Sequence, residues 1–188
     1  MSKVVFDRIL GRNCAPTFKG IKAASLISLP VSSYDECKCW LEQYIPAMCQ
    51  HGIKYIVLAI EARHILVLIY NEKQLELILA HSKARHILAQ YGYPQNGGLK
   101  ALLMHLKSRC RASDEFPHEI GLFLDYPPDD VQGFIIHKGS NFRYAGYWKI
   151  YVNEAATRAF FDRITACTEA FCNKLDSGIP MTDLLIAG

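Results

Sequence analysis

Ile53-Lys-Tyr-Ile-Val-Leu-Ala-Ile60, followed by Glu61-Ala-Arg-His64 and Ile65-Leu-Val-Leu-Ile-Tyr70, is the stretch that decides the fold. The outer two runs are rich in β-branched and aromatic residues, which favour strands. Their connection is short, so an antiparallel hairpin is the economical arrangement. Nearly every position in both runs is apolar, whereas a sheet with one face in water alternates. We therefore predict a hairpin that is covered on both faces.

Helical patterns flank this hairpin. Residues 33–50 begin with a capping serine and acidic residues, but Pro46 predicts a kink or an early stop. Residues 72–90 form one predicted helix capped by Asn71. From Leu99 to Cys110, leucines recur at helical spacing opposite a basic face, which predicts an amphipathic helix.

The second half of the chain adds short elements and one long helix. Residues 118–124 and 129–137 read as two short helices around Tyr126-Pro-Pro128. Residues 146–152 alternate as a strand does, and we expect residues 147–152 to join the sheet of the hairpin. Asn153 then caps a long helix with an apolar stripe. The predicted fold is α+β: a single domain over residues 1–188, with a small, mainly antiparallel sheet of at least three strands packed with several helices.

Composition narrows the class of protein. The 188 residues are 51% hydrophobic and 21% charged, which excludes a disordered chain. The longest apolar runs are too short to cross a bilayer, and residues 1–10 lack the apolar centre of a signal peptide. We expect a soluble, cytoplasmic protein without membrane contact. The net charge of +3 is too small to indicate nucleic acid by itself.

Seven cysteines occur without C-x-x-C or zinc-finger spacing. Their odd number and poor spacing predict reduced thiols and no disulfide framework. The histidines have no ligand spacing, so no metal site is predicted. No phosphate-binding glycine loop is present, and no cofactor is indicated.

The segment from Asn13 to Lys22 holds the first candidate group. Cys14 lies near Lys19 and Lys22, and cations lower the pKa of a thiol, so an activated nucleophile is one interpretation. The other is a turn with Cys14 as a small buried hydrophobe.

The second candidate segment runs from Phe116 to Ile135. His118 and Glu119 are adjacent, so on a helix they diverge by about 100° and form no dyad. The two short helices also have the rhythm of a helix-turn-helix. However, Asp129 and Asp130 would begin the recognition helix and repel phosphate. Specific nucleic-acid binding is therefore not expected, and only weak, salt-sensitive binding is predicted.

The third candidate segment, residues 141–151, is dense in aromatic residues. Tyr147 and Trp148 could stack on a flat ligand, and Lys149 could bind its phosphates. The alternative is an aromatic core strand whose cations extend to the surface.

Three motifs together resemble a known family. They are Cys14-Ala-Pro-Thr-Phe-Lys-Gly-Ile-Lys22, Phe116-Pro-His-Glu-Ile-Gly-Leu-Phe-Leu-Asp-Tyr-Pro127 and Gly146-Tyr-Trp-Lys-Ile-Tyr151. This pattern resembles an uncharacterised bacterial family described only as a domain of unknown function. The resemblance implies a bacterial cytoplasmic protein but no chemistry. It also leads us to expect glycine at the position of Asp125.

We combine these segments in one hypothesis, a small-molecule or cofactor-binding protein that could also be an enzyme. Its pocket would gather side chains from all three motifs, with Glu119 as the partner of a buried Lys22. The predicted site residues are Cys14, Lys22, His118, Glu119, Tyr147, Trp148 and Lys149. The alternative is a helix-turn-helix DNA-binding regulator or an interaction module that uses the basic face of residues 100–111. The sequence names no ligand, reaction, cofactor or oligomeric state.

Overall fold

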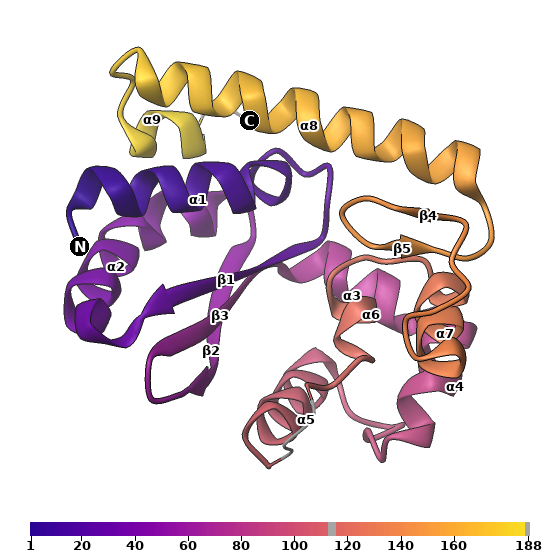
Figure 1. Ribbon diagram of the computed structural model, residues 1–188. Coiled ribbons are helices and arrows are strands. Elements are labelled where there is room, and N and C mark those ends of the chain that lie inside the picture. Colours follow the sequence, from indigo (N-terminus) through magenta and orange to yellow (C-terminus); the bar gives the residue numbers. More distant parts are fainter. Residues whose placement is uncertain (113–115, 187–188) are drawn as a thin grey trace.

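The computed structural model describes residues 1–112 and 116–186 (Figure 1). A three-stranded antiparallel sheet lies at its centre, with β3 between β1 and β2. The elements in chain order are α1 (Lys3–Phe18), β1 (Ala24–Pro30), a 3-10 turn (Val31–Ser33), α2 (Tyr34–Gln50), β2 (Ile53–Ile60), β3 (His64–Asn71), α3 (Glu72–Ala80), α4 (Ser82–Gln90), α5 (Leu99–Ala112), α6 (Ile120–Phe123), α7 (Pro128–His137), β4 (Tyr144–Ala145), β5 (Lys149–Ile150), α8 (Glu154–Asp176) and α9 (Met181–Ile186). The α+β prediction is confirmed.

Strand β3 explains how the sheet is held. Ile65, Val67 and Ile69 pack into a core with α1, α2 and α9. Leu66 and Leu68 point the other way, into a core with α3, α4, α5 and α6. Helices therefore cover both faces of the sheet (Figure 1), as the continuous apolar run predicted. The antiparallel pairing of β2 with β3 is also confirmed, with a bulge between Val57 and Ala59.

The third strand of this sheet is β1, and sequence reasoning placed a different segment there. Ala24 pairs with Tyr70 and Pro30 with His64, so β1 fills the free edge of β3. The prediction that residues 147–152 join this sheet is wrong. Strand β5 instead pairs with β4, in a separate two-stranded sheet. Beyond β5, the backbone amides of Tyr151 and Val152 donate to the Asp130 carboxylate, which ends the strand.

Two helix predictions also need correction. Residues 72–90 form α3 and α4, because the backbone is extended at His81 (ψ 137°). The buried residues Leu79 and Ala84 are five apart, so a straight helix would turn the second apolar stripe away from the core. The break at His81 turns the apolar side of α4 towards the same core as that of α3. Helix α2 does not stop at Pro46 but continues to Gln50. The predicted caps at Asn71 and Asn153 are confirmed, since each side chain accepts from a backbone amide of the first turn.

Two long helices that are far apart in the sequence, α1 and α8, lie side by side in the fold. Helices α1 and α8 pack along one another, and Phe18 and Phe171 bring their rings to 6.0 Å between centroids (Figure 1). Over residues 1–112 and 116–186, no helix combines the length and the apolar character needed to span a membrane.

Candidate functional site

A cavity of about 430 Å³ lies between α6, α7 and the turn that joins β4 to β5. We call it the aromatic cavity. Its wall includes Phe116, His118, Phe134, Tyr147, Trp148 and Lys149. Two of the three sequence motifs therefore meet at one concave surface. The volume falls within the range of small-molecule pockets, about 300–1,000 Å³.

Asp130 builds one side of this cavity. Its side chain is buried, and one carboxylate oxygen accepts from Trp148 Nε1 at 3.0 Å. The other oxygen accepts from the amides of Tyr151 (2.8 Å) and Val152 (3.2 Å). A buried carboxylate is stable only when its oxygens are hydrogen-bonded in this way. Asp130 thereby ties α7 to the β4–β5 hairpin and fixes the indole that lines the cavity.

Trp148 forms part of the cavity wall, but it does not present a free flat face. Tyr126 stacks on it with ring centroids 4.5 Å apart and an interplanar angle of 24°. Phe161 meets it edge-on, also at 4.5 Å. Trp148 is 8% exposed and packs with Ile150 and Ile164 in a third core cluster. The indole therefore serves as a rigid wall, which is closer to the core-strand alternative than to a stacking platform.

The side chains that remain accessible lie at the mouth of the cavity. Tyr147 is half exposed and hydrogen-bonds Thr165 of α8 at 2.9 Å. His118 is exposed and contacts the Phe134 ring edge-on at 4.9 Å between centroids. Lys149 donates to the Gly139 carbonyl at 2.6 Å. The mouth thus offers one imidazole and one ammonium beside aromatic surface.

Lys149 is held by more than its hydrogen bond. Its Nζ lies 4.8 Å from the centroid of the Phe142 ring and 5.8 Å from that of Phe134. These contacts leave donor capacity on the ammonium, because only one of its three protons is used by Gly139. No carboxylate within the described residues forms an ion pair with Lys149. A ligand anion at the mouth would meet an uncompensated positive charge.

Glu119 does not belong to this cavity. It is fully buried, and Oε1 accepts from Arg109 Nε at 2.9 Å and from Tyr93 Oη at 3.2 Å. The predicted divergence of His118 and Glu119 is confirmed, since only His118 lines the cavity. Burial and the charge of Glu119 raise the pKa of Cys110 to about 11. Glu119 therefore anchors α5 to α6, and the expectation that it partners Lys22 is wrong.

Cys14 lies outside the aromatic cavity as well. It is fully buried in α1, among the residues that pack under the sheet. Burial raises the pKa of its thiol far above the usual value, and the opposing effect of Lys22 is smaller. An activated thiol needs a lowered pKa, so the structure favours the buried-hydrophobe interpretation. All seven cysteines are free thiols.

Lys22 lines a second cavity of about 290 Å³, which we call the lysine cavity. It adjoins the aromatic cavity, because both are lined by Leu124, Tyr126 and Tyr147. The motif that contains Cys14 thus reaches the neighbourhood of the site through Lys22. Asp125 is the carboxylate whose charge acts on Lys22, and its Oδ2 accepts from the Ala23 amide at 3.0 Å.

The backbone conformation at Asp125 explains why glycine was expected at this position. Its φ is 63°, in the left-handed region that glycine occupies without strain. Aspartate is one of the few other residues that tolerate this conformation. The unusual backbone places the Asp125 carboxylate beside the residue before β1, where it accepts a hydrogen bond from the Ala23 amide.

The argument against DNA binding rested on the two acidic residues of α7, and the structure changes that premise. Asp130 is buried, and Asp129 pairs with Lys83 of α4 at 2.8 Å. Neither carboxylate therefore acts as a free charge in the way the sequence suggested. The first turn of α7 is held against α4, and α6 is only four residues long. The prediction of weak, non-specific DNA binding stays a prediction.

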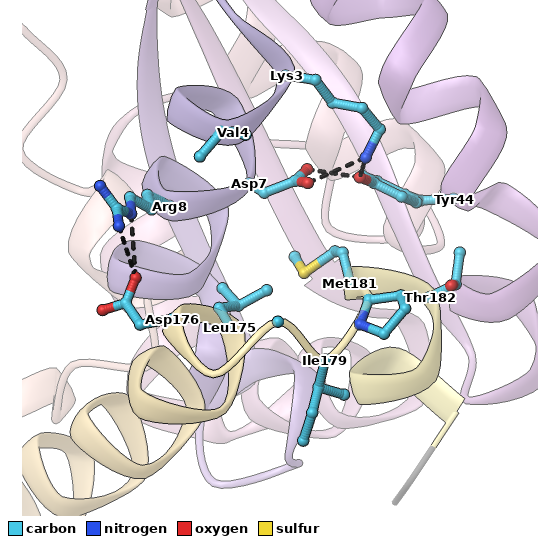
Figure 2. Close-up of a pocket in the computed structure, with 12 residues that line it drawn as sticks. Lys3, Val4, Asp7, Arg8, Tyr44, Leu175, Asp176, Ile179, Met181 and Thr182 are labelled. Carbon is cyan, nitrogen blue, oxygen red and sulfur yellow. Dashed lines mark hydrogen bonds and ion pairs between the residues drawn. The ribbon is translucent and has the colours of Figure 1, made fainter.

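A third hollow, of about 320 Å³, lies where α1 meets α2 and the α8–α9 connection. Figure 2 shows its charged side chains paired within the hollow: Tyr44 donates to Asp7 at 2.5 Å, Lys3 donates to both, and Arg8 contacts Asp176 at 2.9 Å. These charges compensate each other within the protein. This hollow therefore joins helices and offers no unmatched group to a ligand.

Sequence reasoning missed two features of the site. The role of Asp130 in fixing Trp148 was hidden, because the residues are 18 apart and no local pattern links them. Helix α1 was missed too, although Phe6, Leu10, Cys14 and Phe18 recur at four-residue spacing and are all buried. That stripe could have identified the helix and placed Lys22 in the connection that follows it.

The chain was compared with known protein families, curated proteins and solved structures. A family model described as "Protein of unknown function (DUF3793)" matches residues 10–185. No curated protein and no solved structure matches the chain.

Proposed function

Since the chain belongs to the DUF3793 family of proteins of unknown function, we propose its function from the cavity itself: it is a small-molecule-binding protein of the bacterial cytoplasm. The ligand is flat, largely apolar and carries an anionic or hydrogen-bond-accepting group. The observation that carries this proposal is the meeting of the His118 and Trp148 segments at the aromatic cavity.

The chemistry of the wall selects the ligand class. Phe116 and Tyr147 are large apolar side chains that are about half exposed (46% and 50%), and a ligand would remove them from water. Burying apolar area contributes about 25 cal/mol per Å², so two aromatic side chains supply several kcal/mol of affinity. Lys149 and His118 at the mouth favour an anion or an acceptor over a cation. Asp130 has its carboxylate oxygens occupied by internal donors, so it does not attract a cationic ligand.

The first test uses a flat anionic probe, anilinonaphthalene sulfonate, and its uncharged relative phenylnaphthylamine. We expect both to bind saturably to one site, followed by their fluorescence. Lys149→Met should weaken binding of the sulfonate by about ten- to a hundredfold, because one charge-assisted contact is worth about 1.5–3 kcal/mol. The uncharged probe should bind Lys149→Met as it binds the original protein.

A matched pair of substitutions locates the probe. Ala145 lines the aromatic cavity and is exposed, so Ala145→Phe fills the mouth without removing a core side chain. Ala159→Phe adds the same group to an exposed position of α8 outside the cavity. We expect only Ala145→Phe to reduce probe binding. Equal binding to both variants, or binding that does not saturate, would refute the assignment of the site.

The natural ligand is sought separately. Ultraviolet–visible and mass spectra of gently purified protein would reveal a retained chromophore or small molecule. DNA binding, the alternative, is tested by fluorescence anisotropy at physiological salt with the same protein. A tight, sequence-selective complex there would favour the regulator over the small-molecule-binding protein.

A further inference from the structure

The lysine cavity has a chemistry of its own, distinct from that of the aromatic cavity. Its wall is formed by residues of α1, β1 and α8, together with the connection that follows α6. The polar side chains that face it include Arg12, Asn13, Lys22, Ser25 and Thr168. Two of these are cations, and none is an acid. The nearby Asp125 supplies the carboxylate that acts on Lys22.

Lys22 differs from the lysines that stabilise this fold. Lys54 and Lys83, for example, contact carboxylates at 2.7 and 2.8 Å. Within residues 1–112 and 116–186, the Lys22 ammonium makes no hydrogen bond and no ion pair within 4.0 Å. Its contact is with the Tyr126 ring, 5.3 Å from Nζ to the centroid. Mostly buried and without a direct carboxylate partner, this amine is costly to keep charged.

The titration of Lys22 follows from these surroundings. Burial lowers the pKa of Lys22 from 10.5 to about 8, while Asp125 and, to a smaller extent, Cys14 raise it. The other charged or titratable groups at the cavity are Arg12 on α1, Tyr126 after α6 and Tyr147 on the β4–β5 turn. Near neutral pH the uncharged fraction of this amine is therefore on the order of a hundredfold larger than that of an ordinary lysine.

We propose that Lys22 Nζ is a nucleophilic amine that forms an imine with a small carbonyl compound whose anionic group is bound by Arg12. Arg12 is exposed at the cavity and pairs with no carboxylate among the described residues. Guanidinium binds carboxylate or phosphate through paired hydrogen bonds, so the ligand class is a small aldehyde or ketone with such a group. Desolvated lysines are the ones that act as amine nucleophiles in proteins.

The step balances without any redox partner. The Nζ lone pair attacks the carbonyl carbon, which forms a C–N bond and a carbinolamine. Both amine protons move to the former carbonyl oxygen, which leaves as water while the C=N bond forms. The hydroxyl-bearing residues that line the cavity are Ser25, Thr168, Tyr126 and Tyr147, and together with solvent they can pass these protons. This inference is independent of ligand binding in the aromatic cavity, although Leu124, Tyr126 and Tyr147 border both cavities.

The test treats the intact protein with glyoxylate and sodium cyanoborohydride, which reduces an imine to a stable secondary amine. Peptide mapping by mass spectrometry then locates the carboxymethyl group. We expect the first group on Lys22, before any exposed lysine. Lys22→Arg should abolish this first modification, and Lys54→Arg, at an exposed ion-paired lysine, should retain it. Modification spread over exposed lysines would overturn the proposal, and the mapping of unaltered protein decides this without any variant.

Two further variants test the surroundings. Arg12→Leu should slow modification by glyoxylate about tenfold and leave modification by the uncharged acetaldehyde unchanged. Equal effects on both reagents would overturn the role of Arg12. Asp125→Gly removes the carboxylate that raises the pKa of Lys22, at a φ that glycine adopts freely. The pH midpoint of modification should then move downward. A midpoint that stays or rises would show that the reacting amine is not the one beside Asp125.

Discussion

Asp130→Asn replaces one side chain by another of nearly the same size and shape, yet we expect it to destabilise the protein strongly. The carboxylate accepts three N–H donors, from Trp148, Tyr151 and Val152, at 3.0, 2.8 and 3.2 Å. An asparagine has one oxygen and one NH₂ group, so one acceptor position becomes a donor that faces a donor. At least one buried N–H group then loses its partner.

The magnitude follows from hydrogen-bond energetics. A buried donor left without an acceptor costs about 1–3 kcal/mol, and the remaining bonds lose the extra strength that a charged acceptor gives. We expect the free energy of unfolding to fall by about 2–4 kcal/mol, which is a large part of the stability of an ordinary domain. The cavity wall loosens at the same time, because Trp148 loses its anchor.

Asp129→Asn is the matched control. The neighbouring Asp129 side chain is 45% exposed and pairs with Lys83 at the surface, where such pairs contribute about 0–1 kcal/mol. Urea unfolding followed by far-ultraviolet circular dichroism measures both variants. If Asp130→Asn lost less than about 1 kcal/mol, or no more than Asp129→Asn, the assigned role of Asp130 would be wrong.

Three further expectations concern other groups. Glu119→Gln should lower the free energy of unfolding by about 1–3 kcal/mol, since it removes the charge that Arg109 and Tyr93 contact, whereas Glu154→Gln on exposed α8 should change it by less than about 0.5 kcal/mol. Because burial lowers the pKa of Lys22 to about 8 in the folded protein, the unfolded state binds more protons at this amine between about pH 8 and 10.5, so the contribution of Lys22 to stability should rise over that window. The buried thiols of Cys14 and Cys110 have raised pKa values and contribute in the opposite direction, so the effect of Lys22 is the difference between the original protein and the variant that lacks the amine. Lys22→Met should lose this rise in urea unfolding at pH 7.5 and 10, and an unchanged pH dependence would contradict the burial of the amine. Thiol titration of denatured protein without reductant should find close to seven thiols, and five or fewer would contradict the reduced state.

Local patterns predicted the parts of the fold that depend on neighbours in sequence. The hairpin followed from two apolar runs and a short connection, and the caps at Asn71 and Asn153 followed from residue type and position. Strand β1 could not be found in this way, because its pairing with β3 joins residues about forty positions apart. The fate of residues 147–152 was likewise decided elsewhere, by an acceptor on α7.

The candidate site was predicted in part for the same reason. His118, Tyr147, Trp148 and Lys149 meet at one cavity, but chemistry-bearing residue types alone could not show which side of a helix each would occupy. Glu119 follows His118 directly and points into the α5–α6 core instead. Cys14 and Lys22 come from one short segment, yet one is sealed in α1 and the other lines a cavity.

The packing of α1 against α8 has a consequence for the protein as it is being made. On the ribosome, α1 emerges before α8, and at roughly 5–20 residues per second α8 follows on the order of ten seconds later. Throughout that interval Phe18, which meets Phe171 in the finished protein, has no α8 to cover it. A nascent chain stalled before residue 154 therefore exposes apolar side chains of α1, and chaperone binding should be strongest before α8 has been synthesised.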